Sequence, residues 1–172
     1  MNRRMSMSIV VKRRSIRKYT DQPVSDKDIE DILLAGMSAP SAGNQQPWHF
    51  IVIRDRAKLD KIPEINPYAK LLEHAPVAIL VCGDTRLEKH EGFWVQDCSA
   101  ATENILIEIS SKGLGGVWLG FYPMKDRVEG IKKLFNLPRE VYPLSLIALG
   151  HPAEKPEQAE RFKKERIHFY TW

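Results

Sequence analysis

Six consecutive apolar residues, Val77-Ala-Ile-Leu-Val-Cys82, constrain the fold of this chain more than any other feature. A strand with one face in water alternates apolar and polar residues, whereas an unbroken apolar run indicates a strand that is covered on both faces. The run is also far too short to span a bilayer. The sequence therefore predicts a sheet that other elements cover on both sides.

Patterns on either side of this run predict a mixed α and β domain. Apolar residues at helical spacing indicate one helix after the N-cap Ser25 and a longer, buried helix that ends at Gly113. The apolar positions of these two helices are Ile29, Ile32, Leu33 and Met37, then Trp94, Cys98, Ala101, Ile105 and Ile109. With neither an internal repeat nor a linker, residues 1–172 are expected to form a single domain.

Shorter segments complete the predicted order of elements. We expect a short helix at 7–14 with Ile9 and Val10 facing inward, and another helix that starts at Asp126. Strands are expected at 50–53, within 113–123, and at 144–149 after a turn bracketed by Pro138 and Pro143. The aromatic end, residues 167–172, is expected to be a strand or an extended arm that packs on a partner subunit.

Composition and charge narrow the class of protein without choosing its function. The chain is 43% hydrophobic and 28% charged, as in globular proteins with a packed core. Cys82 and Cys98 do not form a spaced pair, and no apolar segment near the N-terminus is long enough for a secretion signal. We therefore predict a cytoplasmic protein without a membrane anchor. The net charge of +4 is concentrated in residues 1–20, which suits nucleic acid, a small phosphate ligand, or solubility alone.

Several common catalytic signatures are missing. Neither Gly-x-Gly-x-x-Gly after a strand nor the Gly-x-x-x-x-Gly-Lys-Ser/Thr phosphate loop occurs. The five histidines lack the spacing of metal ligands, and no Gly-x-Ser-x-Gly sequence marks a hydrolase nucleophile. No pair of carboxylates stands out for acid–base catalysis, because the acidic residues fall mostly on the solvent faces of predicted helices. We therefore predict no metal site and no catalytic side chain.

Two polar stretches remain as candidate binding segments. Arg13-Arg14-Ser15-Ile16-Arg17 offers three guanidinium groups and a hydroxyl, which suit phosphate oxygens; taken alone, the stretch is equally well explained as a solvated basic turn. The second, Ala39-Pro-Ser-Ala-Gly-Asn-Gln-Gln-Pro-Trp-His-Phe50, lies between a predicted helix and a predicted strand and is stiffened by two prolines. Its amides suit the polar edge of a planar ring, although an ordinary capped turn explains the same residues.

Together with Gly-Leu-Gly-Gly-Val-Trp-Leu-Gly at 113–120 and Leu-Gly-His-Pro-Ala-Glu-Lys-Pro at 149–156, these two stretches resemble the nitroreductase family of flavoenzymes. The motifs keep the family order and extend over residues 10–172. The resemblance implies an α+β fold with a central, mostly antiparallel sheet flanked by helices. It also implies a homodimer that exchanges C-terminal arms and holds FMN non-covalently at its interface.

The resemblance also assigns cofactor-binding residues. Those that match ligands of the FMN phosphate and ribityl chain are Arg13, Arg14, Ser15 and, near the C-terminus, Arg161 or else Lys163. Those that match cations at the pyrimidine edge of the flavin are Arg17 and Lys70. Pro40, Ser41, Asn44 and Gln46 match the loop that the opposite subunit contributes to the flavin site. The backbone beside the central flavin ring, where an amide N–H reaches N5, corresponds to Trp118, Leu119 and Gly120.

The activity that the resemblance implies is a ping-pong transfer of electrons from NAD(P)H to FMN and then to a nitroaromatic or quinone acceptor. Reduced FMN is negatively charged at N1 and O2, so the protein contributes cations and orientation rather than a nucleophile. A non-catalytic FMN-binding or sensing module, or a divergent reaction such as dehalogenation, stays open. A nucleic-acid binder is disfavoured because the aromatic residues fall mostly on predicted core stripes. The short chain leaves little room for the helices that cover the flavin in larger relatives, which implies an open site.

Overall fold

The computed structural model describes residues 8–157 and 159–172. Its α-helices are α1 (Ile9–Lys12), α2 (Asp26–Met37), α3 (Arg56–Leu59), α4 (Ile62–Ile65), α5 (Trp94–Ser111) and α6 (Lys125–Phe135). Its strands are β1 (Trp48–Ile53), β2 (Val77–Asp84), β3 (Gly115–Gly120) and β4 (Val141–Gly150). Short 3-10 helices are η1 (Ala42–Asn44), η2 (Pro67–Glu73), η3 (Thr85–Leu87) and η4 (Lys164–Arg166).

The four strands form one antiparallel sheet in the order β1-β2-β4-β3. All eight residues of β2 are buried, which confirms the strand predicted from the continuous apolar run. Because β2 pairs with β1 on one side and β4 on the other, its backbone groups are satisfied within the sheet. The edge strand that matters for the candidate site is β3, which pairs with β4 through one edge only.

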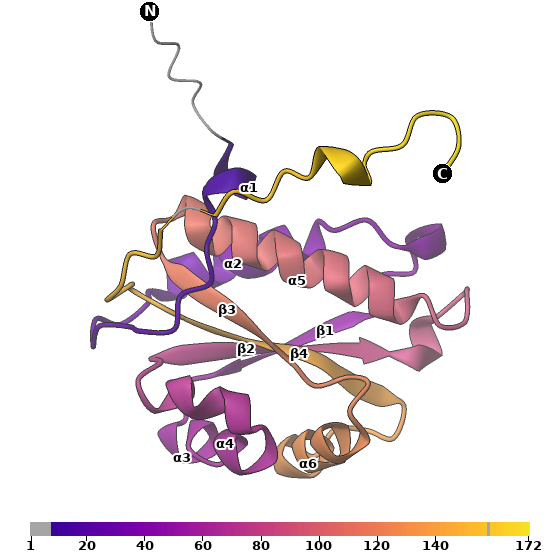
Figure 1. Cartoon of the computed structure of the whole chain (residues 1–172). Helices are drawn as coiled ribbons and strands as arrows, with labels where there is room; N and C mark the ends of the chain where they lie inside the picture. The colour runs from indigo at the N-terminus through magenta and orange to yellow at the C-terminus, as the bar shows by residue number, and fades with distance from the viewer. Residues whose placement is uncertain (1–7, 158) are drawn as a thin grey trace, which may run out of the picture.

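Helices cover both faces of the sheet (Figure 1). On one face α2 and α5 pack over a core that includes Ile32, Ile79 and Ile105, all completely buried. On the other face α3, α4, η2 and α6 close a second core around Leu59, Leu80 and Ile131. The α+β fold with an antiparallel sheet flanked by helices is therefore confirmed, and so is the burial of the five apolar positions predicted for α5.

Some predicted details are wrong for reasons that the packing explains. Val10 and Val11 are more than half exposed, because α1 has only four residues and lies on the surface; Met7, where the helix was expected to begin, lies outside the described residues. Met37 is also exposed, at the last turn of α2. Pro143 lies inside β4 rather than in the turn before it, opposite Cys82 at a register shift, where a residue without an N–H is tolerated.

The C-terminal residues form an arm rather than a strand. After β4 the chain passes α1 and continues beyond α5 with a single short 3-10 turn, η4 (Figure 1). Phe169, Tyr170 and Trp172 are fully or largely exposed on this arm. In the described parts of the chain, no helix is both long and apolar enough to cross a membrane.

Candidate functional site

The arginine-rich segment is held against the open edge of β3. Ser15 forms a parallel bridge to Gly116, and the Ile16 N–H donates to the Gly116 carbonyl at 3.0 Å. A Cβ atom at Gly115 would lie 2.6 Å from Cγ2 of Ile16, so the missing side chain of this glycine permits the close approach. The bridge places the segment that begins at Arg13 beside the strand that carries Trp118 to Gly120.

The chain after β4 supports the same segment from its other side. The Glu154 carboxylate accepts hydrogen bonds from the Arg17 N–H at 2.5 Å and from the Lys18 N–H at 3.2 Å. The Tyr19 hydroxyl lies 2.6 Å from the Ile16 carbonyl and 3.1 Å from the Ala148 carbonyl. Burial raises the pKa of this hydroxyl above its ordinary value, so Tyr19 remains a neutral donor at neutral pH. The position of the arginine segment is therefore fixed mainly by contacts of its backbone and of Tyr19.

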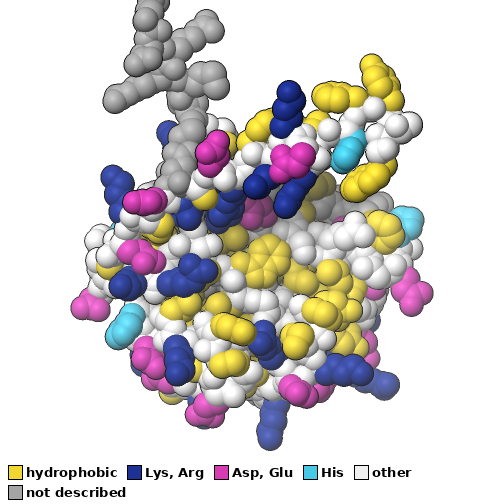
Figure 2. All heavy atoms as spheres, viewed as in Figure 1, with side chains coloured by type: hydrophobic (Ala, Val, Ile, Leu, Met, Phe, Trp, Pro, Cys, Tyr) yellow, Lys and Arg dark blue, Asp and Glu magenta, His cyan; other side chains and the backbone are white. Residues whose placement is uncertain are grey.

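The predicted phosphate ligands converge on a hollow between the N-terminal segment and the C-terminal arm. Arg14, Ser15 and Arg161 line one cavity of about 350 Å³, together with Glu154 and Pro156. Arg17, which was predicted for the pyrimidine edge of the flavin, lines the same cavity. Arg13 lines an adjoining cavity with Arg14 and Arg161, and its Nε lies 3.2 Å from Oε1 of Glu103 on α5. Figure 2 shows basic side chains gathered above a group of hydrophobic side chains on this face. Residues that are almost 150 positions apart thus meet at one electropositive site.

Arg14 has an unusual environment within this cluster. Its Nε and Nη1 atoms are buried, yet neither has a hydrogen-bond partner among the described residues. A buried guanidinium without an acceptor is unfavourable, and in proteins such groups are normally paired. An anionic ligand with several oxygens would supply the missing acceptors.

The edge strand β3 presents backbone groups next to this cluster. In a strand the N–H and C=O of one residue point to the same side, and successive residues alternate. The Gly116 carbonyl points outward to Ile16, whereas the Phe121 N–H points inward to the Leu144 carbonyl at 3.0 Å. The N–H groups of Trp118 and Gly120 therefore point to the open edge, and that of Leu119 points to β4. The Trp118 side chain is 36% exposed on this edge strand.

Lys70 is tied to the end of the same strand through Asn66. The buried Asn66 side chain accepts from the Tyr68 N–H at the start of η2 and donates to the Gly120 carbonyl at 3.3 Å. Lys70 is exposed on η2, on the helical turn that this amide caps. The contact brings η2 to the end of β3, whereas Lys70 itself lines neither of the cavities that contain the arginines.

The amide-rich loop is held by hydrogen bonds to residues that the sequence did not single out. The buried Asp97 carboxylate on α5 accepts from the Ala42 N–H at 3.0 Å and from the Gln45 Nε2 at 2.6 Å. The other side-chain atom of the same amide, Gln45 Oε1, accepts from the N–H groups of Lys89 and His90. Gln45 is thus a structural member of the loop. Asp97 is an exception to the expectation that the acidic residues lie mostly on solvent faces, and its contacts are those of a structural residue.

The predicted ligand residues of this loop face outward. Pro40, Asn44 and Gln46 are exposed, while the Ser41 hydroxyl accepts from the Gln46 N–H at 3.0 Å. Asn44 and Gln46 both have positive φ, at 53° and 49°, a conformation that non-glycine residues seldom adopt. The loop contacts α5 at Asp97, whereas Arg13 contacts it at Glu103, about 9 Å further along the helix axis. Among the described residues, no hydrogen bond or ion pair joins the loop to the arginines.

Cysteine and metal chemistry receive no support from the described residues. Both cysteines are buried and free, and burial raises the pKa of the Cys82 thiol to about 12, so that it stays protonated and unreactive. No group of three or more histidine, cysteine or acidic side chains in the described chain is placed to hold a metal ion.

Comparison with known proteins gives the family. The model of the nitroreductase family matches residues 10–151, which include the arginine segment, the amide loop and all four strands. The chain belongs to the nitroreductase family.

Individual relatives agree with this membership. The chain is 55% identical to a Methanothermobacter thermautotrophicus protein named "Putative NADH dehydrogenase/NAD(P)H nitroreductase", over 93% of this chain and 84% of that one. It is 30% identical to the Bacillus subtilis FMN reductase [NAD(P)H], over 90% of this chain and 68% of that protein. The solved structure of an FMN-dependent nitroreductase from Clostridium difficile matches this chain with a TM-score of 0.88 and 26% identity, and the match covers 95% of this chain and 98% of that one.

In this nitroreductase, the Asp97 carboxylate is predicted to set the geometry of the amide loop. Asp97→Ala removes the acceptor of two loop hydrogen bonds and should lower the free energy of unfolding by about 2–4 kcal/mol, as measured by urea denaturation. Hydrogen exchange should increase at the Ala42 amide more than elsewhere. Asp21→Ala, at an exposed carboxylate, is the control. A loop with unaltered exchange in the Asp97 variant would contradict the role assigned to this residue.

Proposed function

We propose that this chain is an FMN-dependent oxidoreductase that passes electrons from NAD(P)H to nitroaromatic, quinone or similar acceptors. Membership of the nitroreductase family and the names of relatives, an FMN reductase [NAD(P)H] and an FMN-dependent nitroreductase, support the cofactor and the electron donor. The observation that carries the proposal is the meeting of Arg13, Arg14, Ser15, Arg17 and Arg161 beside the open edge of β3.

The residues present fit FMN at both of its polar ends. A phosphate monoester needs several donors, and Arg14 has two buried guanidinium nitrogens with no acceptor in the described chain. Arg13, Ser15 and Arg161 complete the phosphate and ribityl side, with Arg13 oriented by Glu103. The flavin ring is a flat heterocycle with donors and acceptors on its edge, and β3 offers outward N–H groups at Trp118 and Gly120.

FMN supplies the redox chemistry when it is bound, because it accepts electrons from a nicotinamide and passes them to a second substrate. The chain contributes charge and position. Arg17 and Lys70 supply positive charge for the pyrimidine edge, where a cation favours the reduced and negatively charged form. The outward N–H of Trp118 or Gly120 supplies a fixed donor for the N5 position, which refines the assignment of this segment because the Leu119 N–H points to β4.

We also propose a ping-pong order and an open acceptor site. The connection between β2 and α5 contains only η3 and a few turn residues, so this part of the chain has no helical cover for a flavin face. A single open face would be shared by the nicotinamide and the acceptor in turn. The two buried, free cysteines agree with a reducing compartment, and we propose the cytoplasm.

The active unit is proposed to be a homodimer that combines the arginines of one subunit with the amide loop of the other. The loop is fixed by Asp97 and Gln45, yet Asn44 and Gln46 project into solvent. The C-terminal arm exposes Phe162, Phe169 and Trp172, which a partner subunit would bury. Both features are explained if two copies exchange arms and each copy completes the site of its neighbour.

The test of the function is spectroscopic. Purified protein, reconstituted with FMN if necessary, should be yellow, bleach under anaerobic conditions with NADH or NADPH, and regain its absorbance when a quinone or nitroaromatic compound is added. A protein that binds FMN but is reduced by neither nicotinamide would be a binding or sensing module instead. A protein that ignores FMN would overturn the proposal.

Arg14 gives a prediction in which stability and binding move in opposite directions. Arg14→Met replaces the buried, unpartnered guanidinium by an apolar side chain of similar length. It should raise the free energy of unfolding of the flavin-free protein by about 1 kcal/mol and weaken FMN binding at least about tenfold. Urea denaturation and flavin fluorescence titration measure the two effects. Arg139→Met, on an exposed residue, serves as control, and a loss of stability without loss of affinity would show that Arg14 is structural.

The proposed exchange between subunits predicts the stoichiometry of a mixed dimer. One variant carries Arg13→Ala and Arg17→Ala, and the other carries Asn44→Gly and Gln46→Gly, which keep the positive φ of the loop accessible. Neither homodimer should retain FMN. The mixed dimer should retain one FMN instead of the wild-type two, because one of its two sites receives both wild-type halves. No recovery in the mixed dimer, measured as flavin absorbance per dimer after size-exclusion chromatography, would place the loop and the arginines in the same subunit's site.

A further inference from the structure

Two side chains that have no role in the proposed flavin site meet at the end of the β3 edge. Arg127, on α6, donates from Nη1 to the Gly120 carbonyl at 3.3 Å, and its guanidinium carbon lies 5.4 Å from the centre of the Tyr68 ring on η2. The Asn66 amide donates to the same carbonyl. A cation and an aromatic ring from two separate elements are therefore held together at one point of this edge.

This point adjoins one of the N–H groups proposed for N5 of the flavin. The Gly116 carbonyl points outward, away from β4, and successive residues of a strand alternate, so the carbonyl and the N–H of Gly120 both point to the open edge. The contacts of Arg127 and Asn66 with that carbonyl agree with this direction. A ligand whose reacting atom lay beside the Gly120 N–H would have the Arg127 guanidinium and the Tyr68 ring as neighbours.

The positive charge of Arg127 has no partner that neutralises it. Among the residues that the structure describes, no carboxylate forms an ion pair with this side chain. The Gly120 carbonyl engages one nitrogen of the guanidinium, and the other N–H groups of the fork suit a carboxylate. Arg127 is half-buried, so water screens its charge less than that of a fully exposed residue.

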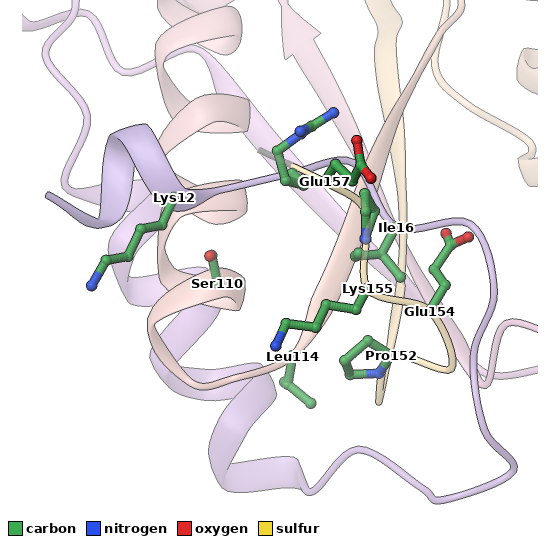
Figure 3. A pocket seen from close by; sticks show the side chains of 10 residues that line it. Lys12, Ile16, Ser110, Leu114, Pro152, Glu154, Lys155 and Glu157 are labelled. Carbon is green, nitrogen blue, oxygen red and sulfur yellow. The ribbon is translucent and has the colours of Figure 1, made fainter. Parts of the chain in front are cut away.

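A second group of cations outside the proposed flavin site lacks this property. Lys12 and Lys155 line a hollow of about 510 Å³ between α1, the end of α5 and the chain after β4, and Glu154 and Glu157 line it with them (Figure 3). The two carboxylates offset the two lysines, so this hollow does not favour an anion. The end of the β3 edge differs because the charge of Arg127 is uncompensated there.

Tyr68 contributes an aromatic surface beside that charge. Its side chain is 72% exposed, yet its position is fixed by two contacts. The Tyr68 N–H donates to the Asn66 side chain at 3.2 Å, and the Arg127 guanidinium lies over the ring. An exposed aromatic ring that is held in place offers its remaining surface to a second flat ring. The pair thus suits a ligand that combines a negative charge with an aromatic ring.

We propose that Arg127 and Tyr68 select the acceptor, and that the preferred acceptors are aromatic compounds with a carboxylate on the ring. The carboxylate binds the Arg127 guanidinium, the ring lies against Tyr68, and the reducible group faces the flavin. This inference rests on the proposed function, because a flavin on this edge is what makes the place a site of reduction. The redox step stays balanced: NAD(P)H is oxidised, and a nitro group takes up two electrons and two protons to give a nitroso group and water.

A pair of acceptors that differ in charge tests the proposal. 4-Nitrobenzoate and 4-nitrobenzamide are similar in size, and they are compared by steady-state kinetics with FMN-loaded, full-length protein and a saturating nicotinamide. The kcat/KM of the wild type should be at least about tenfold higher for the benzoate, because only the anion pairs with Arg127. Arg127→Gln, which keeps an N–H donor for Gly120, should lower the benzoate value at least about tenfold, mainly through KM, and the amide value less than about twofold.

Three further variants serve as controls. Arg127→Lys keeps the charge and should restore part of the preference for the benzoate. Tyr68→Leu should lower kcat/KM by a similar factor for both acceptors, since it removes a ring contact and no charge. Arg139→Gln removes a positive charge from an exposed position in the turn between α6 and β4, and it should leave both values unaltered. All variants should retain bound flavin, as measured by visible absorbance.

Binding without turnover gives a second readout. Calorimetric titration of the oxidised protein should show that the wild type binds benzoate at least about tenfold more tightly than benzamide. The difference should disappear in Arg127→Gln and persist in Arg139→Gln. A purely structural role of Arg127 would not produce an effect that depends on the charge of the ligand.

The outcomes separate this proposal from the proposed function. Equal kcat/KM values for the two acceptors in the wild type, or an equal loss for both in Arg127→Gln, would remove the selection by Arg127 and leave the flavin chemistry intact. A protein that neither nicotinamide reduces would remove the proposed function instead. Calorimetry then still decides on the site, because benzoate binding that depends on Arg127 supports the anion site and its absence contradicts it.

Discussion

The candidate site depends on how the open edge of β3 is covered. An edge strand exposes backbone donors and acceptors, and proteins normally cover or pair them. Here the start of the edge is paired with Ser15 and Ile16, and its end is bound by the side chains of Asn66 and Arg127 at the Gly120 carbonyl. What remains open is the middle, around Trp118. A flat ligand with polar groups on its edge is the kind of molecule that completes such a strand without extending the sheet, and the same pairing brings the arginines within reach of that ligand's anionic end.

Arg14 lowers the stability of the flavin-free chain at a position where its guanidinium would help to bind an anionic ligand. Two buried guanidinium nitrogens without acceptors destabilise the flavin-free chain, and two carboxylates of this region are engaged elsewhere, Glu154 with backbone amides and Glu103 with Arg13. The fold can hold an uncompensated cation there because the surrounding segment is fixed by independent contacts, namely the Ser15 bridge and the Tyr19 hydroxyl. The missing acceptors are therefore most simply explained as those of a ligand.

The helices and strands whose burial follows from the periodicity of their apolar residues could be predicted from the sequence. The prediction failed for residues whose burial depends on contacts with distant parts of the chain. The apolar run of β2 and the stripe from Trp94 to Ile109 are buried as expected, because each pattern has only one arrangement that removes it from water. Val10 looked equally apolar but is exposed, since a four-residue helix has no face to bury. Asp97 and Asn66 were missed because a buried polar residue is defined by its partners, and those partners are far away in the sequence. The arginine and loop motifs were recognisable only through the family resemblance, since each alone also fits a solvated turn.

The conformation of the amide loop bears on the state in which the protein works. Asn44 and Gln46 occupy positive φ, which is unfavourable for Gln and better tolerated by Asn, and in the described chain their exposed side chains form no hydrogen bond. This conformation is maintained by Asp97, near the N-terminal end of α5, and by Gln45 in the loop itself, both of which are buried. A loop that is held rigid in a strained conformation, with its amides directed away from its own subunit, is preorganised for something outside the chain. The arginine cluster of the same chain has no side-chain amides beside it. In a two-fold dimer, the loop of each subunit would supply its amides to the arginine cluster of the other, through a single interface.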